Sequence, residues 1–197
     1  MTLIGVILLT LIISCEQDIV EDANQDNLNT FKMTVNGLIW TPSVIDSCHR
    51  TFICQMSQSI SSSTTNNFYT IEAYRDPSFI ANLSSENFFE IHIINLNKTG
   101  SYIIDGVFED LRLNNVARLT INDLNGKRRY QNKQNATSFK VNVTQLFPSQ
   151  SSSIVGIGGS FSGTLFNIDN AADSIIIKGG EFIFKKTNHN NFNQCKE

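Results

Sequence analysis

Residues 31–40 read FKMTVNGLIW, and this stretch indicates how the rest of the chain folds. Apolar and polar side chains alternate up to the dipeptide Asn36-Gly37, which is the period of a β-strand with one buried face. Asn-Gly is a strong signal for a two-residue hairpin turn, because both residues tolerate positive φ. The stretch therefore predicts an antiparallel hairpin whose second strand reaches Trp40.

The same alternation of apolar and polar residues recurs along most of the chain. It is found in Phe52-Cys54-Met56, Phe89-Ile91-Ile93, Leu119-Ile121, Phe139-Val141-Val143 and Phe182-Phe184. Residues that favour turns stand between these runs, at Lys98-Thr99-Gly100, Asp105-Gly106, Asn125-Gly126 and Gly179-Gly180. Many short strands joined by tight turns predict an all-β fold, a single antiparallel β-sandwich or flattened barrel over residues 30–186.

A few segments depart from this pattern. Asp76-Pro77 supplies an N-cap and a first helical position, so a short helix is predicted from there to about Leu83. Residues 57–67 and 149–153 are rich in polar, uncharged residues, and both are predicted to be loops. The glycine-rich stretch 156–163 predicts a bent strand, because it lacks the Lys-Ser/Thr ending of a phosphate-binding loop.

The charge of the chain is divided unevenly. The 197 residues carry a formal charge of −3, but five of the 18 acidic residues precede Asn29, where no Lys or Arg stands. The remaining body has 13 acidic residues against all 15 basic ones. Such a balanced surface lacks the basic stripe that neutralises phosphates, so nucleic acid is excluded as a predicted partner.

The N-terminus predicts export. Residues 3–13 are almost uniformly apolar, a run too short to cross a bilayer but suited to the core of a signal peptide. Ser14-Cys15 ends this run in a pattern that resembles the bacterial lipobox. We expect residues 1–14 to be removed, Cys15 to carry the lipid anchor, and residues 15–29 to form an acidic tether. An N-terminal strand or buried helix is the alternative, and the lack of any period argues against it.

Three cysteines remain after Cys15, which allows one disulfide within the chain. Cys48 lies beside His49, but an oxidising compartment favours a disulfide over a nucleophilic thiolate. Cys54 alternates with apolar residues and should point into the core. We therefore predict a Cys48–Cys195 disulfide that fixes the polar C-terminal tail, residues 187–197, with Cys54–Cys195 as the alternative.

The other polar residues give little support for catalysis. No zinc-binding, nucleophile-elbow or phosphate-loop motif occurs, so the sequence predicts no catalytic residue, no metal site and no cofactor. His92 follows Glu90 on the polar face of a predicted strand, where we expect a surface histidine rather than a ligand or a base. An acidic turn is predicted in preference to a calcium site at Asp105, Glu109 and Asp110.

A cluster of basic residues follows the Asn125-Gly126 turn. Its members are Lys127, Arg128, Arg129 and Lys133. They are predicted to form a solvated hairpin tip, and contact with anionic glycan or lipid head groups is the alternative.

Both ends of the predicted domain resemble one group of proteins. The opening stretch 31–40 has the form F-x-x-x-V-N-G-x-x-W, and GSFSGTL at residues 159–165 is followed by DSIII at 173–177 and GEF at 180–182. Together with the lipobox, these motifs resemble β-rich lipoproteins of Bacteroidota, to which no activity is assigned. The resemblance implies a β domain that is lipid-anchored in the outer membrane, on its periplasmic or cell-surface side.

Three functions are compatible with these observations. The first is a non-catalytic lipoprotein of the cell envelope that binds a glycan, a protein or another envelope component. The second is a hydrolase of glycans or peptides, which would need a pocket with two carboxylates about 5 to 10 Å apart. The third is a structural subunit of an outer-membrane assembly, for which an exposed edge strand would be evidence.

Overall fold

The computed structural model describes residues 29–43, 52–60, 65–75, 87–108, 114–123, 126–147 and 156–185. They form eleven strands: β1 (Thr30–Val35), β2 (Leu38–Trp40), β3 (Phe52–Ile60), β4 (Thr65–Tyr74), β5 (Phe88–Ile94), β6 (Gly100–Ile103), β7 (Val116–Asp123), β8 (Gly126–Gln131), β9 (Phe139–Phe147), β10 (Gly156–Asn167) and β11 (Ser174–Phe184). Several predicted features lie outside these residues: the signal peptide, Cys15, the tether, Cys48, the short helix, residues 149–153 and Cys195.

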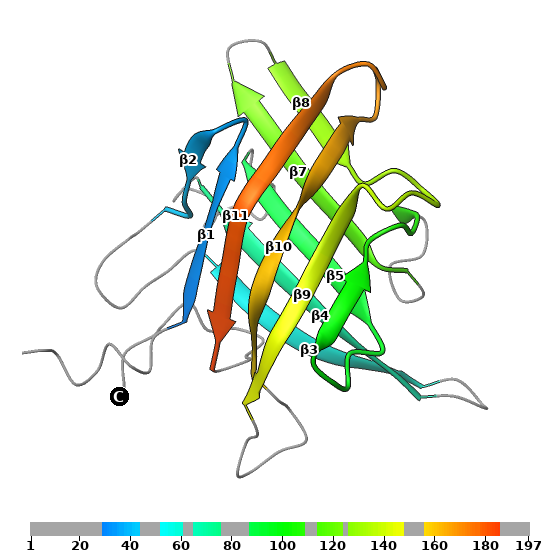
Figure 1. Ribbon diagram of the computed structural model, residues 1–197. Helices are drawn as coiled ribbons and strands as arrows, with labels where there is room; N and C mark the ends of the chain where they lie inside the picture. The colour runs from blue at the N-terminus through cyan, green and yellow to red at the C-terminus, as the bar shows by residue number, and fades with distance from the viewer. Residues whose placement is uncertain are drawn as a thin grey trace, which may run out of the picture.

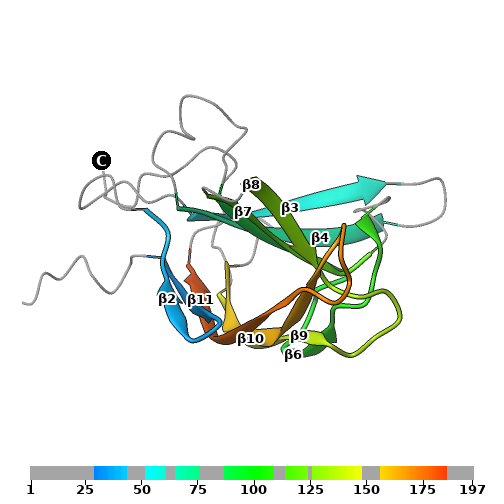
Figure 2. The ribbon, with the colours of Figure 1, turned by 90° about the horizontal axis from the view of Figure 1, so that it is seen from above.

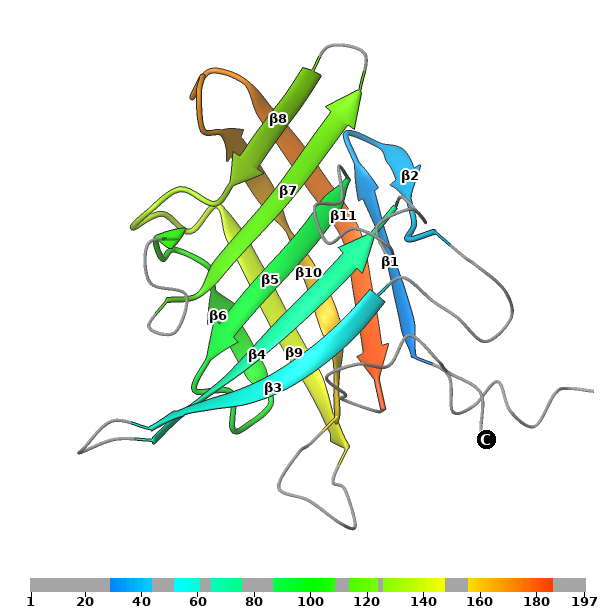
Figure 3. The ribbon, with the colours of Figure 1, turned by 180° about the vertical axis from the view of Figure 1, so that it is seen from behind.

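The strands form two layers that share β10 (Figure 1). The first layer runs β2-β1-β11-β10-β9-β6, and the second runs β8-β7-β5-β4-β3. The first half of β10 pairs with β9, whereas its end, at Phe166 and Asn167, pairs with β8. Figure 2 shows the two layers meeting on the side where β8 pairs with β10. Figure 3 shows the second layer from behind. The paired strands are all antiparallel in the described part of the chain, so the predicted all-β architecture is confirmed.

Aromatic side chains fill the space between the layers. Phe31 on β1 lies with its ring centroid 6.2 Å from Phe52 and 5.8 Å from Phe89, both in the second layer. Phe89 also stacks on Phe161 of β10, at 5.2 Å. Each such pair adds roughly 0.5–1.5 kcal/mol beyond the area that it buries. Cys54 joins this core as a free thiol that is 1% exposed, as its alternation with apolar residues predicted.

The hairpin predicted at Asn36-Gly37 is confirmed. Both residues have positive φ, 50° and 81°, and β1 pairs with β2 on either side of them. Asn36 also fixes the hairpin to β11: its N–H donates to the carbonyl of Ile176, and its Oδ1 accepts from the N–H of Ile176, both at 2.8 Å.

The prediction of a turn at Gly179-Gly180 is wrong, because both residues lie inside β11. They belong to an irregularity at which the pairing with β10 shifts between Phe161 and Gly163. Gly179 takes the positive φ of 56° that the bulge needs. Gly180 leaves room for the ring of Phe161, which a Cβ would overlap. The register shifts along β10 also agree with the bent strand predicted from its glycines.

The loop predicted over residues 57–67 is mostly strand. β3 continues to Ile60 and β4 begins at Thr65, and the two pair without interruption from Ser57↔Phe68 to Ile60↔Thr65. A polar composition did not prevent this, because strand pairing depends on backbone hydrogen bonds, which every residue except proline can supply. In the described part of the chain, no helix has the length and apolar character needed to cross a membrane.

Candidate functional site

A bulge in β9 turns two neighbouring side chains to the same face of the first layer. The pairing of β9 with β10 shifts so that Gly158 lies opposite Gln145, while Gly159 lies opposite Val143. Thr144 is the extra residue, and both Thr144 and Gln145 are exposed where strict alternation would bury one of them. Bulges commonly re-aim side chains in this way.

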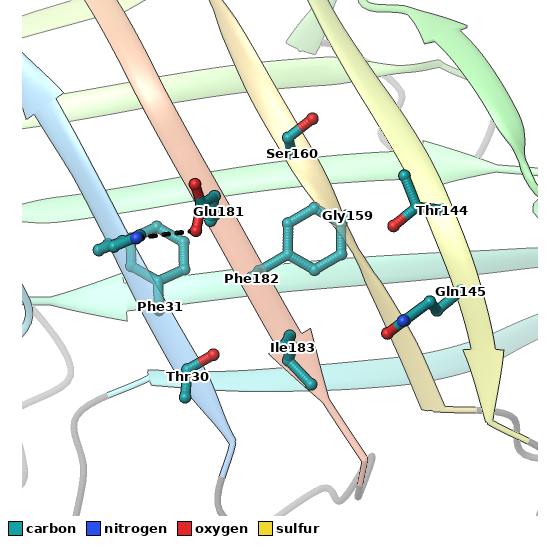
Figure 4. A pocket seen from close by; sticks show the side chains of 10 residues that line it. Thr30, Phe31, Thr144, Gln145, Gly159, Ser160, Glu181, Phe182 and Ile183 are labelled. Atoms are coloured by element: carbon teal, nitrogen blue, oxygen red, sulfur yellow. Dashed lines mark ion pairs between the residues drawn. The ribbon is translucent and has the colours of Figure 1, made fainter.

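These two side chains form one wall of a groove of about 530 Å³ on the outer face of the first layer (Figure 4). The groove crosses β1, β11, β10 and β9, and the following residues line it: Thr30, Phe31, Lys32, Thr144, Gln145, Gly159, Ser160, Glu181, Phe182 and Ile183. Its volume lies within the usual range of ligand sites, roughly 300–1,000 Å³. Small residues of β10 occupy the middle, so a ligand can approach the backbone there.

The groove carries charges that cancel. The amine of Lys32 on β1 lies 2.8 Å from a carboxylate oxygen of Glu181 on β11, and both side chains are more than half exposed. Hydroxyl groups of Thr30, Thr144 and Ser160 and the amide of Gln145 supply further donors and acceptors. This chemistry suits a neutral ligand rich in hydroxyl groups better than a strongly charged ligand.

A second polar group lies on the outer face of the other layer. Glu72 on β4, Glu90 on β5 and Arg118 on β7 stand side by side in one row across the sheet. Arg118 lies 2.7 Å from Glu90, and the hydroxyl of Tyr74 donates to Glu72 at 2.8 Å. Desolvation raises the pKa of both carboxyl groups, and it raises that of Glu90 to about 7 although Arg118 opposes the shift.

His92 continues this outer face, but the expectation of a surface histidine is wrong. The side chain is only 4% exposed, its ring lies edge-on to Phe68 at 4.8 Å, and its ring nitrogens have no hydrogen-bond partner among the described residues. Desolvation lowers the pKa of His92 to about 4, so the imidazole is neutral at pH 7. The sequence correctly predicted that His92 lies on the outer face of β5. It did not predict that His92 is buried there, because the period of a strand does not show whether its outer face is exposed to solvent.

Most of the chain matches one protein family. The family model described as "Domain of unknown function (DUF5025)" matches residues 28–185. The chain belongs to the DUF5025 family. Searches of curated proteins and of solved structures gave no match.

The DUF5025 domain has a pair of carboxylates, but their surroundings differ from those of a glycosidase. Glycoside hydrolysis needs two carboxyl groups that face one bound sugar. Glu90 is 8% exposed and paired with Arg118, and Glu72 accepts from Tyr74. Neither carboxylate lines the groove of the first layer. The pair therefore fits a buried polar network better than a site of hydrolysis.

Other residues singled out in the sequence are dispersed. Asp105 is half-buried, but Glu109 and Asp110 lie outside the described residues, among which no group of three metal-ligating side chains occurs. Lys127, Arg129 and Lys133 are exposed, as a solvated tip predicts, whereas Arg128 is half-buried and donates to the Tyr130 hydroxyl at 3.4 Å. Sequence reasoning missed the groove of the DUF5025 domain. The signal that could have located it is the break in alternation at Thr144-Gln145.

Proposed function

We propose that this protein is a lipid-anchored protein of the cell envelope whose β domain binds a glycan without catalysing a reaction. The groove across β1, β11, β10 and β9 carries this proposal, because it combines a ligand-sized volume with walls that have no net charge and carry three hydroxyl groups.

The proposed anchor rests on the sequence. An apolar run that ends in Ser14-Cys15 fits a lipoprotein signal peptide, and the acidic residues that follow offer nothing to bury. The family model begins at residue 28, which agrees with a tether that joins the lipid at Cys15 to the first strand.

The choice of a glycan rests on the balance of donors and acceptors in the groove. A sugar presents hydroxyl groups that both donate and accept, and Lys32, Glu181 and Gln145 offer both kinds of partner. Glu181 would repel an anionic ligand, and Lys32 would repel a cationic one. A protein ligand is less well supported, because the exposed large apolar residues of the described part are aliphatic and lie outside this groove.

Calorimetric titration of the mature soluble domain with mannan, dextran, laminarin and peptidoglycan fragments tests the proposal. At least one of them should bind, and Ser160→Trp, which places a large ring in the groove, should abolish that binding. Ser101→Trp on β6 is the matched control, because Ser101 is exposed in the same layer and does not line the groove. Equal binding by both variants would refute this site. Release of new reducing ends during the titration would favour the hydrolase instead.

A further inference from the structure

A second pocket lies between the hairpin β1–β2 and the strands β7 and β8. It has a volume of about 310 Å³ and takes residues from both layers. The first layer contributes the hairpin β1–β2 and the start of β11, and the second layer contributes residues of β7 and β8 together with Arg75 after β4 and Asn87 before β5. We call this pocket the mouth; it shares no lining residue with the groove.

The part of the mouth formed by β2 is apolar. The ring centroid of Trp40 lies 6.3 Å from that of Phe31 and 6.4 Å from that of Phe89. The indole is therefore part of the core, and one part of it lines the mouth. Leu38 and Ile39 stand beside it on β2, and each is 75% exposed. Two neighbouring aliphatic side chains exposed at the edge of a pocket are suited to covering an apolar ligand.

Two guanidinium groups and one carboxylate also line the mouth. Arg75 follows β4, Arg128 lies on β8, and Asp173 precedes β11. Asp173 already accepts hydrogen bonds from Asn167 at 2.8 Å and from Tyr130 at 2.9 Å, and these bonds lower its pKa. It therefore stays ionised and partly balances Arg128, whose Nη1 donates to the Tyr130 hydroxyl at 3.4 Å.

Arg75 leaves the mouth with an excess of one positive charge. No carboxylate in the described part of the chain forms an ion pair with it, and its side chain is exposed in the same pocket as the apolar residues of β2. Its backbone is fixed, because its N–H donates to the carbonyl of Asn87 at 3.0 Å. A guanidinium in this position can bind a carboxylate through two parallel hydrogen bonds.

We propose that the mouth binds a free aliphatic carboxylate of the fatty-acid type. The chain of the ligand lies against Trp40, Leu38 and Ile39, and its carboxylate pairs with Arg75. This site is independent of the glycan proposed for the groove, so each proposal can fail without the other.

The test uses Trp40 as the reporter, since it is the single tryptophan of the sequence. Decanoate should change its emission in a saturable manner, and 1-decanol, which has the same tail without the charge, should bind about tenfold more weakly or worse, as expected for a lost charged hydrogen bond. Arg75→Gln should weaken decanoate binding to the level of 1-decanol and leave 1-decanol unchanged. Lys140→Gln on β9 is the control and should bind decanoate as the parent does.

Three results would overturn the proposal. The first is the absence of a saturable change with decanoate. The second is equal affinity for decanoate and 1-decanol, which would remove the role of Arg75. The third is a response to vesicles of phosphatidylglycerol but not to monomeric decanoate, which would assign the mouth to a membrane surface.

Discussion

Glu90 on β5 lies directly opposite Arg118 on β7, with a carboxylate oxygen 2.7 Å from a guanidinium nitrogen. The Arg118 guanidinium also lies over two rings, 4.8 Å from the centroid of Phe108 and 5.9 Å from that of Phe88. Because the pair is largely buried, its attraction is offset by the cost of removing both charges from water. The protein therefore holds an acid whose ionisation is costly, next to a neutral histidine.

The first prediction concerns the pH dependence that Glu90 contributes. Its pKa is raised from 4.5 to about 7 by burial, so its contribution to stability is complete below pH 4.5 and is lost as pH rises through about 7. The free energy of unfolding of the parent, measured relative to Glu90→Gln, should therefore fall over this window, by up to about 3 kcal/mol. Urea unfolding at several pH values measures it. A difference that stays constant with pH would contradict the prediction.

The second prediction concerns His92, which acts in the opposite direction. Burial lowers its pKa from 6.5 to about 4, so its contribution is complete above pH 6.5 and is lost as pH falls through about 4. Relative to His92→Leu, the parent should lose stability on acidification over that window, by up to about 3 kcal/mol. Since the windows of Glu90 and His92 overlap, their contributions to the parent's pH dependence partly cancel. A parent-minus-variant difference that stays constant with pH would show that the imidazole is exposed, and one that rises on acidification would show that the imidazolium has an anionic partner.

The third prediction tests the contact between Gly180 and Phe161. A Cβ at position 180 would overlap the Phe161 ring, so Gly180→Ala should destabilise the domain by about 1–3 kcal/mol through overpacking. Lys178→Ala on the exposed face of the same strand should change stability by less than about 0.5 kcal/mol. Combining Gly180→Ala with Phe161→Leu should recover part of the loss. Additive losses in the double variant would mean that the two residues do not interact.

The fourth prediction concerns the anchor. Cys15→Ala should release the protein from the membrane fraction, because the thiol that accepts the lipid is lost. Fractionation of cells and mass spectrometry of the mature N-terminus measure the outcome. Recovery of the variant in the membrane fraction, or an unmodified Cys15 in the parent, would show that the N-terminus is not a lipoprotein signal.

The fifth prediction is the disulfide Cys48–Cys195. Cys54 is a free, buried thiol, which leaves these two cysteines for each other. Peptide mapping under non-reducing conditions should recover the peptides of Cys48 and Cys195 linked. Alkylation of Cys195 without prior reduction would refute the bridge and would leave residues 187–197 without a covalent tie to the domain.

The local features of this fold could be predicted from the sequence because they depend on neighbouring residues. Alternation from Phe31 to Val35 fixes which side chains face the core, and Asn36-Gly37 fixes where the chain reverses. The same local reasoning was wrong at Gly179-Gly180, where glycine serves a bulge and a ring contact inside a strand. Glycine permits both structures, and only the packing of Phe161 against β11 distinguishes them.

The sites, in contrast, were decided by tertiary structure. Lys32 and Glu181 are separated by most of the domain in sequence. They form an ion pair because β1 pairs with β11 and places Lys32 directly opposite Glu181. Arg75 and Trp40 both line the mouth because the tertiary structure brings the end of β2 and the end of β4 to the same pocket. The sequence by itself determined an all-β domain, its principal hairpin and the buried position of Cys54. The pairing of distant strands decided the groove, the mouth and the burial of His92, because register between strands depends on contacts that no local pattern encodes.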